Sequence, residues 1–88
     1  MRYRAADPAL LRVVPLDWLT AIYHRPSGQT HLVESPVPEL LAALGGDTLS
    51  VEALLSRLVE RYDLLDPHPI SLAARLDELA SVGLVEIA

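Results

Sequence analysis

The sequence predicts one small α+β domain spanning residues 1–88, in which a three-stranded antiparallel sheet over about 10–34 precedes three helices. Residues 10–34 hold apolar, β-branched and aromatic segments separated by short turns, a pattern typical of strands. Residues 36–82 instead carry leucines at helical spacing between proline and glycine breaks. The composition, 51% hydrophobic and 22% charged residues, is that of a folded globular protein, and the length fits a single domain.

The first strand is expected from Leu10 to Leu16, where the residues are apolar and β-branched. Pro15 lacks an amide hydrogen, so this segment is either an edge strand or a strand that ends at Pro15. The second strand is expected from Trp18 to His24, and the third from Thr30 to Glu34.

The connector between the second and third strands has the residues of a tight turn. Pro26 presets its own φ, Ser27 suits the next position, and Gly28 can adopt a left-handed conformation, which together predict a three-residue hairpin loop. The expected register pairs Tyr23 with His31, His24 with Thr30, and Ile22 with Leu32. One face then carries Leu19, Ala21, Tyr23, His31 and Val33, and the other carries Trp18, Thr20, Ile22, His24, Thr30, Leu32 and Glu34.

Both of these faces hold large apolar groups, although helices on one side of a sheet require only one apolar face. Either the N-terminal arm with Tyr3 folds over the back of the sheet, or that face meets a partner such as a second copy in a homodimer. Leu, Val, Ile and Ala are expected to form the core around four larger rings, Tyr3, Trp18, Tyr23 and Tyr62.

Three helices are expected over about 36–44, 50–63 and 70–82. Gly45-Gly46 ends the first helix, Ser50 is the N-cap of the second, and Asp66-Pro67-His68-Pro69 breaks the chain before the third. Gly83 is a candidate left-handed C-cap, and the residues after it form a small extended tail or wing. The inward side chains are expected to be Leu40, Leu41 and Leu44, then Val51, Leu54, Leu55, Leu58, Val59 and Tyr62, then Leu72, Ala73, Leu76, Leu79 and Ala80.

Composition and charge disfavour several classes of function. Without cysteine there is no disulfide framework and no thiolate metal site, which is consistent with a reducing cytoplasm. We expect neither a signal peptide nor a membrane-spanning segment, because the longest uninterrupted apolar stretches are a few residues. The formal net charge of −5 is opposite to the balance expected of a protein that binds phosphate backbones.

No set of residues forms a recognisable catalytic or metal site, so we expect a protein that is not an enzyme and has no cofactor. The expected register separates His24 from His31, and a metal site would need a further ligand beside them, for which His68 is the remaining histidine. Ser27 and His31 lack a positioned acid and an oxyanion hole. Gly45-Gly46-Asp47 lacks the remaining residues of a phosphate loop. Asp77 and Glu78 are interpreted as a solvated helix face.

The hairpin Tyr23-His24-Arg25-Pro26-Ser27-Gly28-Gln29-Thr30-His31-Leu32, a leucine-rich helix pair and the closing Gly83-Leu84-Val85-Glu86 resemble the PqqD-like family. The narrower resemblance is to the branch that accompanies an HPr-kinase-like protein, in which a Ser-Gly-x-Thr-His stretch follows a Tyr-His strand end. The similarity extends from about Val14 to Glu86, and Gln29 stands where an acidic residue is expected.

The resemblance implies a winged helix-turn-helix-like peptide chaperone, related to the recognition elements that hold the leader of a ribosomally synthesised precursor for a modifying enzyme. In such domains the leader adds as a strand to the third strand and packs beside the third helix. Carried over to this chain, the peptide-binding residues are Gln29, Thr30, His31, Leu32, Val33, Glu34, Leu72, Arg75, Leu76 and Leu79. A meander ordered 1-2-3 also leaves the third strand with a free edge that can recruit a peptide.

Two alternative functions remain open. The chain is a regulatory subunit that docks on an HPr-kinase-like partner, or it is a winged-helix DNA-binding protein with its third helix in the major groove. The charge of that helix argues against DNA, because Arg75 stands beside Asp77 and Glu78.

Overall fold

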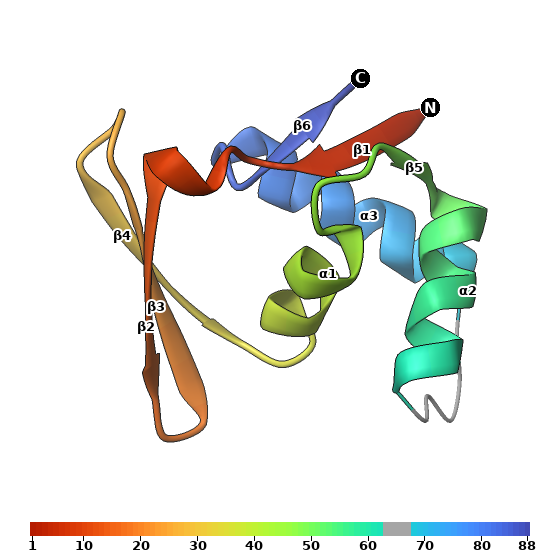
Figure 1. Cartoon of the computed structure of the whole chain (residues 1–88), viewed down its shortest axis with the longest axis horizontal. Coiled ribbons are helices and arrows are strands. Elements are labelled where there is room, and N and C mark those ends of the chain that lie inside the picture. The colour runs from red at the N-terminus through yellow and green to blue at the C-terminus, as the bar shows by residue number, and fades with distance from the viewer. Residues whose placement is uncertain (63–67) are drawn as a thin grey trace.

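A computed structural model describes residues 1–62 and 68–88. The described residues form two three-stranded antiparallel sheets and three α-helices, which is an α+β fold (Figure 1). The elements in chain order are β1 (Arg2–Ala5), a 3-10 turn (Pro8–Leu10), β2 (Leu11–Leu16), β3 (Leu19–His24), β4 (Gln29–Glu34), α1 (Val37–Leu44), β5 (Leu49–Ser50), α2 (Val51–Arg61), α3 (Pro69–Ser81) and β6 (Val85–Ile87).

The expected meander is confirmed as a sheet in the order β2-β3-β4, here called the hairpin sheet. Its register differs by one residue from the expected one, because Ile22 pairs with His31, Tyr23 with Thr30 and His24 with Gln29. The connecting loop is therefore four residues long, 25–28, and Gly28 closes it by donating its N–H to the His24 carbonyl at 2.9 Å. Gly28 has the expected left-handed backbone, with φ of 70°.

A one-residue slip exchanges the two faces of a strand relative to its neighbour, so the expected face assignment is wrong for β4. His24 and His31, expected on opposite faces, lie on the same inner face as the buried Ile22. The inner face carries Leu11, Val13, Pro15, Thr20, Ile22, His24, Gln29, His31 and Val33, and the outer face carries Arg12, Val14, Leu16, Leu19, Ala21, Tyr23, Thr30, Leu32 and Glu34.

A second sheet, in the order β5-β1-β6, is absent from the sequence-based expectation. The N-terminal arm does not fold over the back of the hairpin sheet, since it forms β1 between the two-residue β5 and the C-terminal β6. This placement buries Tyr3 in the core and turns the expected C-terminal tail into a paired strand.

The helices agree closely with their expected ranges, although position 63 and the break at 66–67 lie outside the described residues. Ser50 caps α2, since its hydroxyl accepts the Ala53 N–H at 3.1 Å. Gly45, with φ of 57°, follows α1, and Gly83, with φ of 82°, follows α3. Val59 was expected inward but is 48% exposed.

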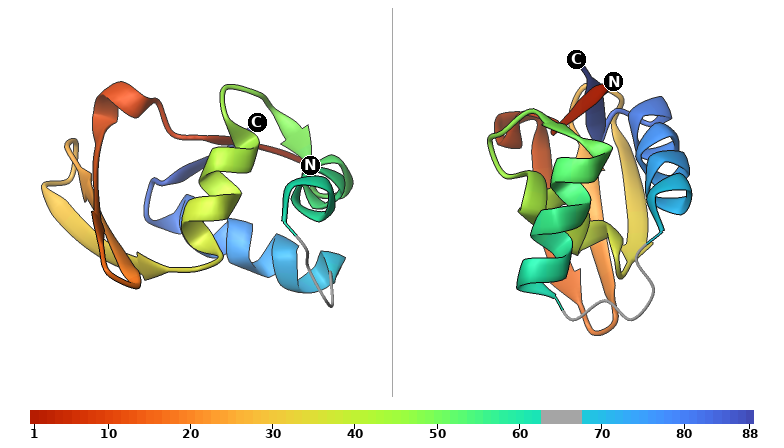
Figure 2. Two further views of the ribbon diagram at one scale, coloured as in Figure 1. Left: turned by 60° about the horizontal axis from the view of Figure 1, so that its bottom comes forward. Right: turned by 90° about the vertical axis from the view of Figure 1, so that its right-hand side faces the viewer.

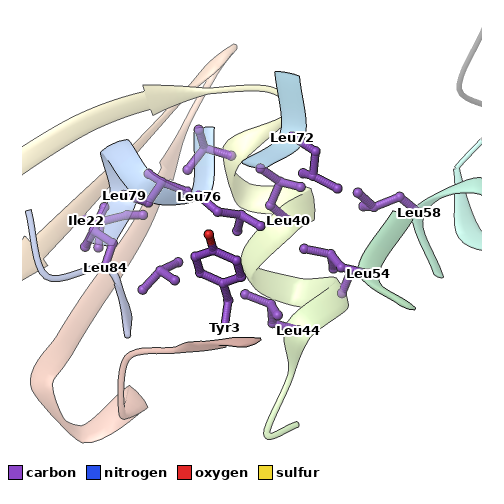
Figure 3. Packing of buried hydrophobic residues seen from close by; sticks show 13 residues of the cluster. Tyr3, Ile22, Leu40, Leu44, Leu54, Leu58, Leu72, Leu76, Leu79 and Leu84 are labelled. Carbon is purple, nitrogen blue, oxygen red and sulfur yellow. The ribbon is translucent and has the colours of Figure 1, made fainter. Parts of the chain in front are cut away.

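The core lies between the inner face of the hairpin sheet, the second sheet and the three helices, with α1 between the hairpin sheet and α2 (Figures 1 and 2). Tyr3 lies at its centre, among leucines from α1 and α3 and beside Leu84 (Figure 3). Trp18, expected in the core, is 77% exposed because it occupies the turn between β2 and β3.

Candidate functional site

Among residues 1–62 and 68–88, no strand pairs with the outer edge of β4, and its outward backbone groups can be assigned to particular residues. Arg25 donates its N–H to the Leu10 carbonyl at 2.8 Å, which extends the β2–β3 ladder by one pair. Hydrogen-bonded and non-bonded pairs alternate in an antiparallel ladder, so Ile22 and its neighbours two residues away bond toward β4. The N–H and C=O groups that face away from the sheet on β4 are therefore those of Thr30, Leu32 and Glu34.

The opposite edge of the hairpin sheet is less able to pair with another strand. By the same alternation, the outward backbone groups of β2 belong to Leu11, Val13 and Pro15. Pro15 has no N–H to donate, which is why a proline is tolerated there and why the edge of β2 is interrupted. β4 contains no proline and keeps its full set of outward donors.

The structure leaves most of the expected β4 site residues accessible. Leu32 is 63% exposed, while His31 and Val33 are half-buried because their side chains lie on the inner face. Arg75 is exposed on α3. The exposed members of the expected set are Gln29, Thr30, Leu32, Glu34 and Arg75.

The three expected leucines of α3 do not line an open groove. Leu72, Leu76 and Leu79 are buried in the core, and Leu76 has no exposed surface. Val33 of β4 packs against the core cluster to which these three leucines belong. These leucines hold α3 on the core, whereas direct contact with a ligand requires the exposed residues.

His31 holds an unpaired polar atom, a feature the sequence did not indicate. Its Nε2 is shielded from solvent and has no hydrogen-bond partner among the described residues. Buried polar atoms are normally paired, so this nitrogen is an exception among the described residues. The buried position of this nitrogen follows from the observed β3–β4 register, which sets the His31 side chain on the inner face.

Ser27 pairs with His24, not with His31. Its hydroxyl lies 2.7 Å from His24 Nδ1, and the Gln29 N–H also donates to Ser27 Oγ at 3.3 Å. The other ring nitrogen of His24, Nε2, lies against Gly83: a Cβ placed on this glycine would be 2.8 Å from it. These contacts fix the β3–β4 loop and link it to the end of α3.

Asp77 belongs to a hydrogen bond that the solvated-face interpretation missed. It accepts a hydrogen bond from the buried Tyr3 hydroxyl at 2.8 Å. This hydrogen bond, reinforced by burial and by the carboxylate charge, raises the pKa of Tyr3 above its ordinary value of 10.0. The pair joins β1 to α3 and is structural.

A mostly apolar hollow of about 500 Å³ lies at the β2 side of the hairpin sheet, away from the β4 edge. It separates the inner face of β2 and β3 from α1 and has Val13, Ile22 and Leu41 in its wall. The sequence-based expectation placed no site there, because the faces of β2 follow only from the pairing of β2 with β3.

Within residues 1–62 and 68–88, no group of three His, Asp or Glu side chains is placed to hold a metal ion. None of the helices described for this chain is long and apolar enough to cross a bilayer. Comparisons with protein-family models, curated proteins and solved structures found no match to this chain. A function for the candidate site therefore has to be inferred from the geometry of this chain alone.

Proposed function

We propose that this domain binds an extended peptide by adding it as a fourth strand to β4. The observation that carries the proposal is the free, proline-free edge at Thr30, Leu32 and Glu34, whose backbone groups face away from the sheet. Strand addition obtains its affinity from main-chain hydrogen bonds and its selectivity from side chains beside the strand.

Exposed residues on β4 and on α3 are the candidates for selecting peptide side chains. Arg75 of α3 is exposed and can pair with an acidic peptide side chain, while Leu32 offers apolar contact. Leu72, Leu76 and Leu79 hold α3 in place from below.

Under this proposal the fold is a PqqD-like variant of the winged helix, with a second sheet that joins the two ends of the chain. The domain acts as a non-catalytic chaperone that holds a ribosomally synthesised precursor peptide and presents it to a modifying enzyme. The open edge and the PqqD-like hairpin support this assignment together, because a leader held as a strand needs such an edge.

The test is amide chemical-shift mapping on the ¹⁵N-labelled chain with a synthetic peptide of about ten residues, a common strand length, that alternates leucine and aspartate. We expect shifts at 29–34 and around Arg75. The same peptide with every backbone nitrogen methylated has no N–H to donate and should bind far more weakly. Shifts that avoid both segments would refute the site.

Leu32→Pro gives a sharper test, because it removes an outward N–H that the hairpin sheet does not use. Peptide binding should be lost while circular dichroism stays unchanged, as the presence of Pro15 on the other edge suggests. Leu32→Ala is the matched control, since it loses the apolar contact but keeps the N–H, and it should bind more weakly than the parent chain but far more tightly than Leu32→Pro. Binding by both variants would exclude strand addition.

A gel shift with labelled duplex and a pull-down with an HPr-kinase-like protein test the two alternatives.

A further inference from the structure

The outer face of the hairpin sheet is largely apolar, and no helix or strand of the described residues covers it. None of the described helices packs on it, and all three lie on the other side of the sheet (Figure 1). Val14, Leu16, Tyr23 and Leu32 are between 37% and 63% exposed on this face, and Trp18 adjoins it in the β2–β3 turn. A contiguous patch of this kind on a small protein marks an interaction surface.

The register arranges the outer face as a grid of three rows across the three strands. Its two charged residues, Arg12 and Glu34, stand at opposite corners. The rows are Arg12-Tyr23-Thr30, Val14-Ala21-Leu32 and Leu16-Leu19-Glu34.

We propose that a second copy of this chain packs on the outer face, related by a twofold axis along the diagonal from Thr30 to Leu16. This axis places Arg12 of each copy over Glu34 of the other, so that the interface contains two identical ion pairs. It also sets Tyr23 over Leu32 and Val14 over Leu19, and brings Leu16, Ala21 and Thr30 each against its own equivalent. The strands then cross at a right angle, one of the two known geometries for stacked sheets.

The other symmetric arrangements leave the charges unmatched. An axis along the strands sets Glu34 over Leu16, and an axis across them sets Arg12 over Leu16. The second diagonal brings Arg12 onto Arg12 and Glu34 onto Glu34, which are repulsive contacts. The charge pattern therefore selects one axis and disfavours the alternatives, as interfaces with a specific geometry commonly do.

The geometry sets both the fit and the strength of this dimer. Rows are about 6.8 Å apart along a strand, and strands are about 4.8 Å apart. Because these spacings differ, Arg12 of one copy lies about 3 Å from the position directly over Glu34 of the other. Arginine and glutamate are long enough to span that distance. The grid covers roughly 300 Å² in projection, well below the roughly 800 Å² per partner of a stable complex, which predicts a weak, reversible dimer.

Sedimentation velocity of the full chain from about 10 µM to about 1 mM tests the dimer across the range of weak affinities. The sedimentation coefficient should rise with concentration, and the emission of Trp18, the chain's one tryptophan, should shift to the blue as the turn becomes buried. A chain that stays monomeric throughout overturns the proposal and leaves the face to another protein.

Charge exchange distinguishes this axis from any other interface. Arg12→Glu and Glu34→Arg should each weaken dimerisation by about tenfold, because each creates two like-charge contacts, and the double variant should restore it. Glu60→Arg, on the exposed side of α2, is the matched control and should have no effect. Leu32→Asp should abolish the dimer with the fold intact. Failure of the double variant to recover, or a dimer that survives Leu32→Asp, overturns the proposal.

Discussion

The Tyr3 hydroxyl donates a hydrogen bond to Asp77 Oδ1 at 2.8 Å, which joins β1 to α3 across 74 positions of the sequence. Tyr3→Phe keeps the buried ring and removes this bond together with the contact between the hydroxyl and Met1 Sδ at 3.1 Å, so it should lower the free energy of unfolding by about 1 kcal/mol. Urea denaturation measures the loss. Tyr23→Phe is the control, since its exposed ring should tolerate the change within about 0.5 kcal/mol. Equal effects of the two variants would contradict the structural role of the bond.

Stability should fall in alkaline solution for the same reason. The pKa of Tyr3 is raised in the folded chain, mainly by the hydrogen bond to Asp77, so folding favours the neutral phenol. Its contribution is complete below the unfolded pKa of about 10 and is lost as the pH rises through the folded pKa. Unfolding titrations at about pH 8 and about pH 11 should show this loss in the parent chain and a smaller one in Tyr3→Phe. Identical losses would exclude Tyr3 as the cause.

Gly83→Ala should destabilise the fold through two separate effects. The left-handed backbone at this residue disfavours any side chain, at a cost of about 1 kcal/mol, and a Cβ would lie 2.8 Å from His24 Nε2. Thermal unfolding of Gly83→Ala with and without His24→Ala separates them. Removing the ring should relieve the clash and leave the backbone cost. A Gly83→Ala chain as stable as the parent would contradict both.

Ser50→Ala should remove the N-cap of α2 and cost about 1 kcal/mol, because the Ala53 N–H loses its side-chain acceptor. Ser56→Ala, in the exposed interior of the same helix, is the matched control and should be neutral or slightly stabilising. Chemical denaturation of both variants measures the difference. The absence of a difference would show that water replaces the cap at no cost.

Leu76→Glu should unfold the chain, because it places a carboxylate at a position with no exposed surface. Arg75→Glu, one residue away on the exposed face of α3, should leave the fold unchanged and weaken binding of the acidic probe peptide. Circular dichroism and peptide titration check the two outcomes. A folded Leu76→Glu chain would show that the core around α3 is less tightly packed than the structure indicates.

The parts of the fold that were predicted from sequence depend on local signals. Ser50, Gly28 and Gly83 act through their own backbone or their nearest neighbours, and each has the role its residue type suggested. The leucine spacing of α3 likewise identified its buried side, since one helix face follows from sequence alone.

The errors concern pairings that local signals do not determine. The β3–β4 loop has four residues instead of the expected three, so the cross-strand partner of Ile22 is His31 and not Leu32. No residue type in the loop distinguishes the two lengths. The second sheet escaped notice because β5 has two residues and pairs with a strand more than forty positions earlier. Trp18 was expected in the core on hydrophobicity, yet turn geometry placed it in solvent.

The candidate site was predicted in part. The free edge at β4 follows from a meander of three hairpin-connected strands, and the structure has that strand order. The groove wall did not follow, because helix periodicity identifies Leu72, Leu76 and Leu79 as apolar without showing whether they face the core or a ligand. The structure places them in the core.

The pairing of β1 with β6 has a consequence for the order of folding. Tyr3 lies opposite Ile87, so this sheet closes a loop of nearly the whole chain, whereas the hairpin sheet and the helices depend on near neighbours. Loop closure costs more entropy as the loop lengthens, and distant contacts form slowly. We expect the hairpin sheet and the helices to form first and the second sheet to form last. A mechanical force on either terminus should therefore first separate β1 from β6, the paired strands that hold the two ends of the chain together.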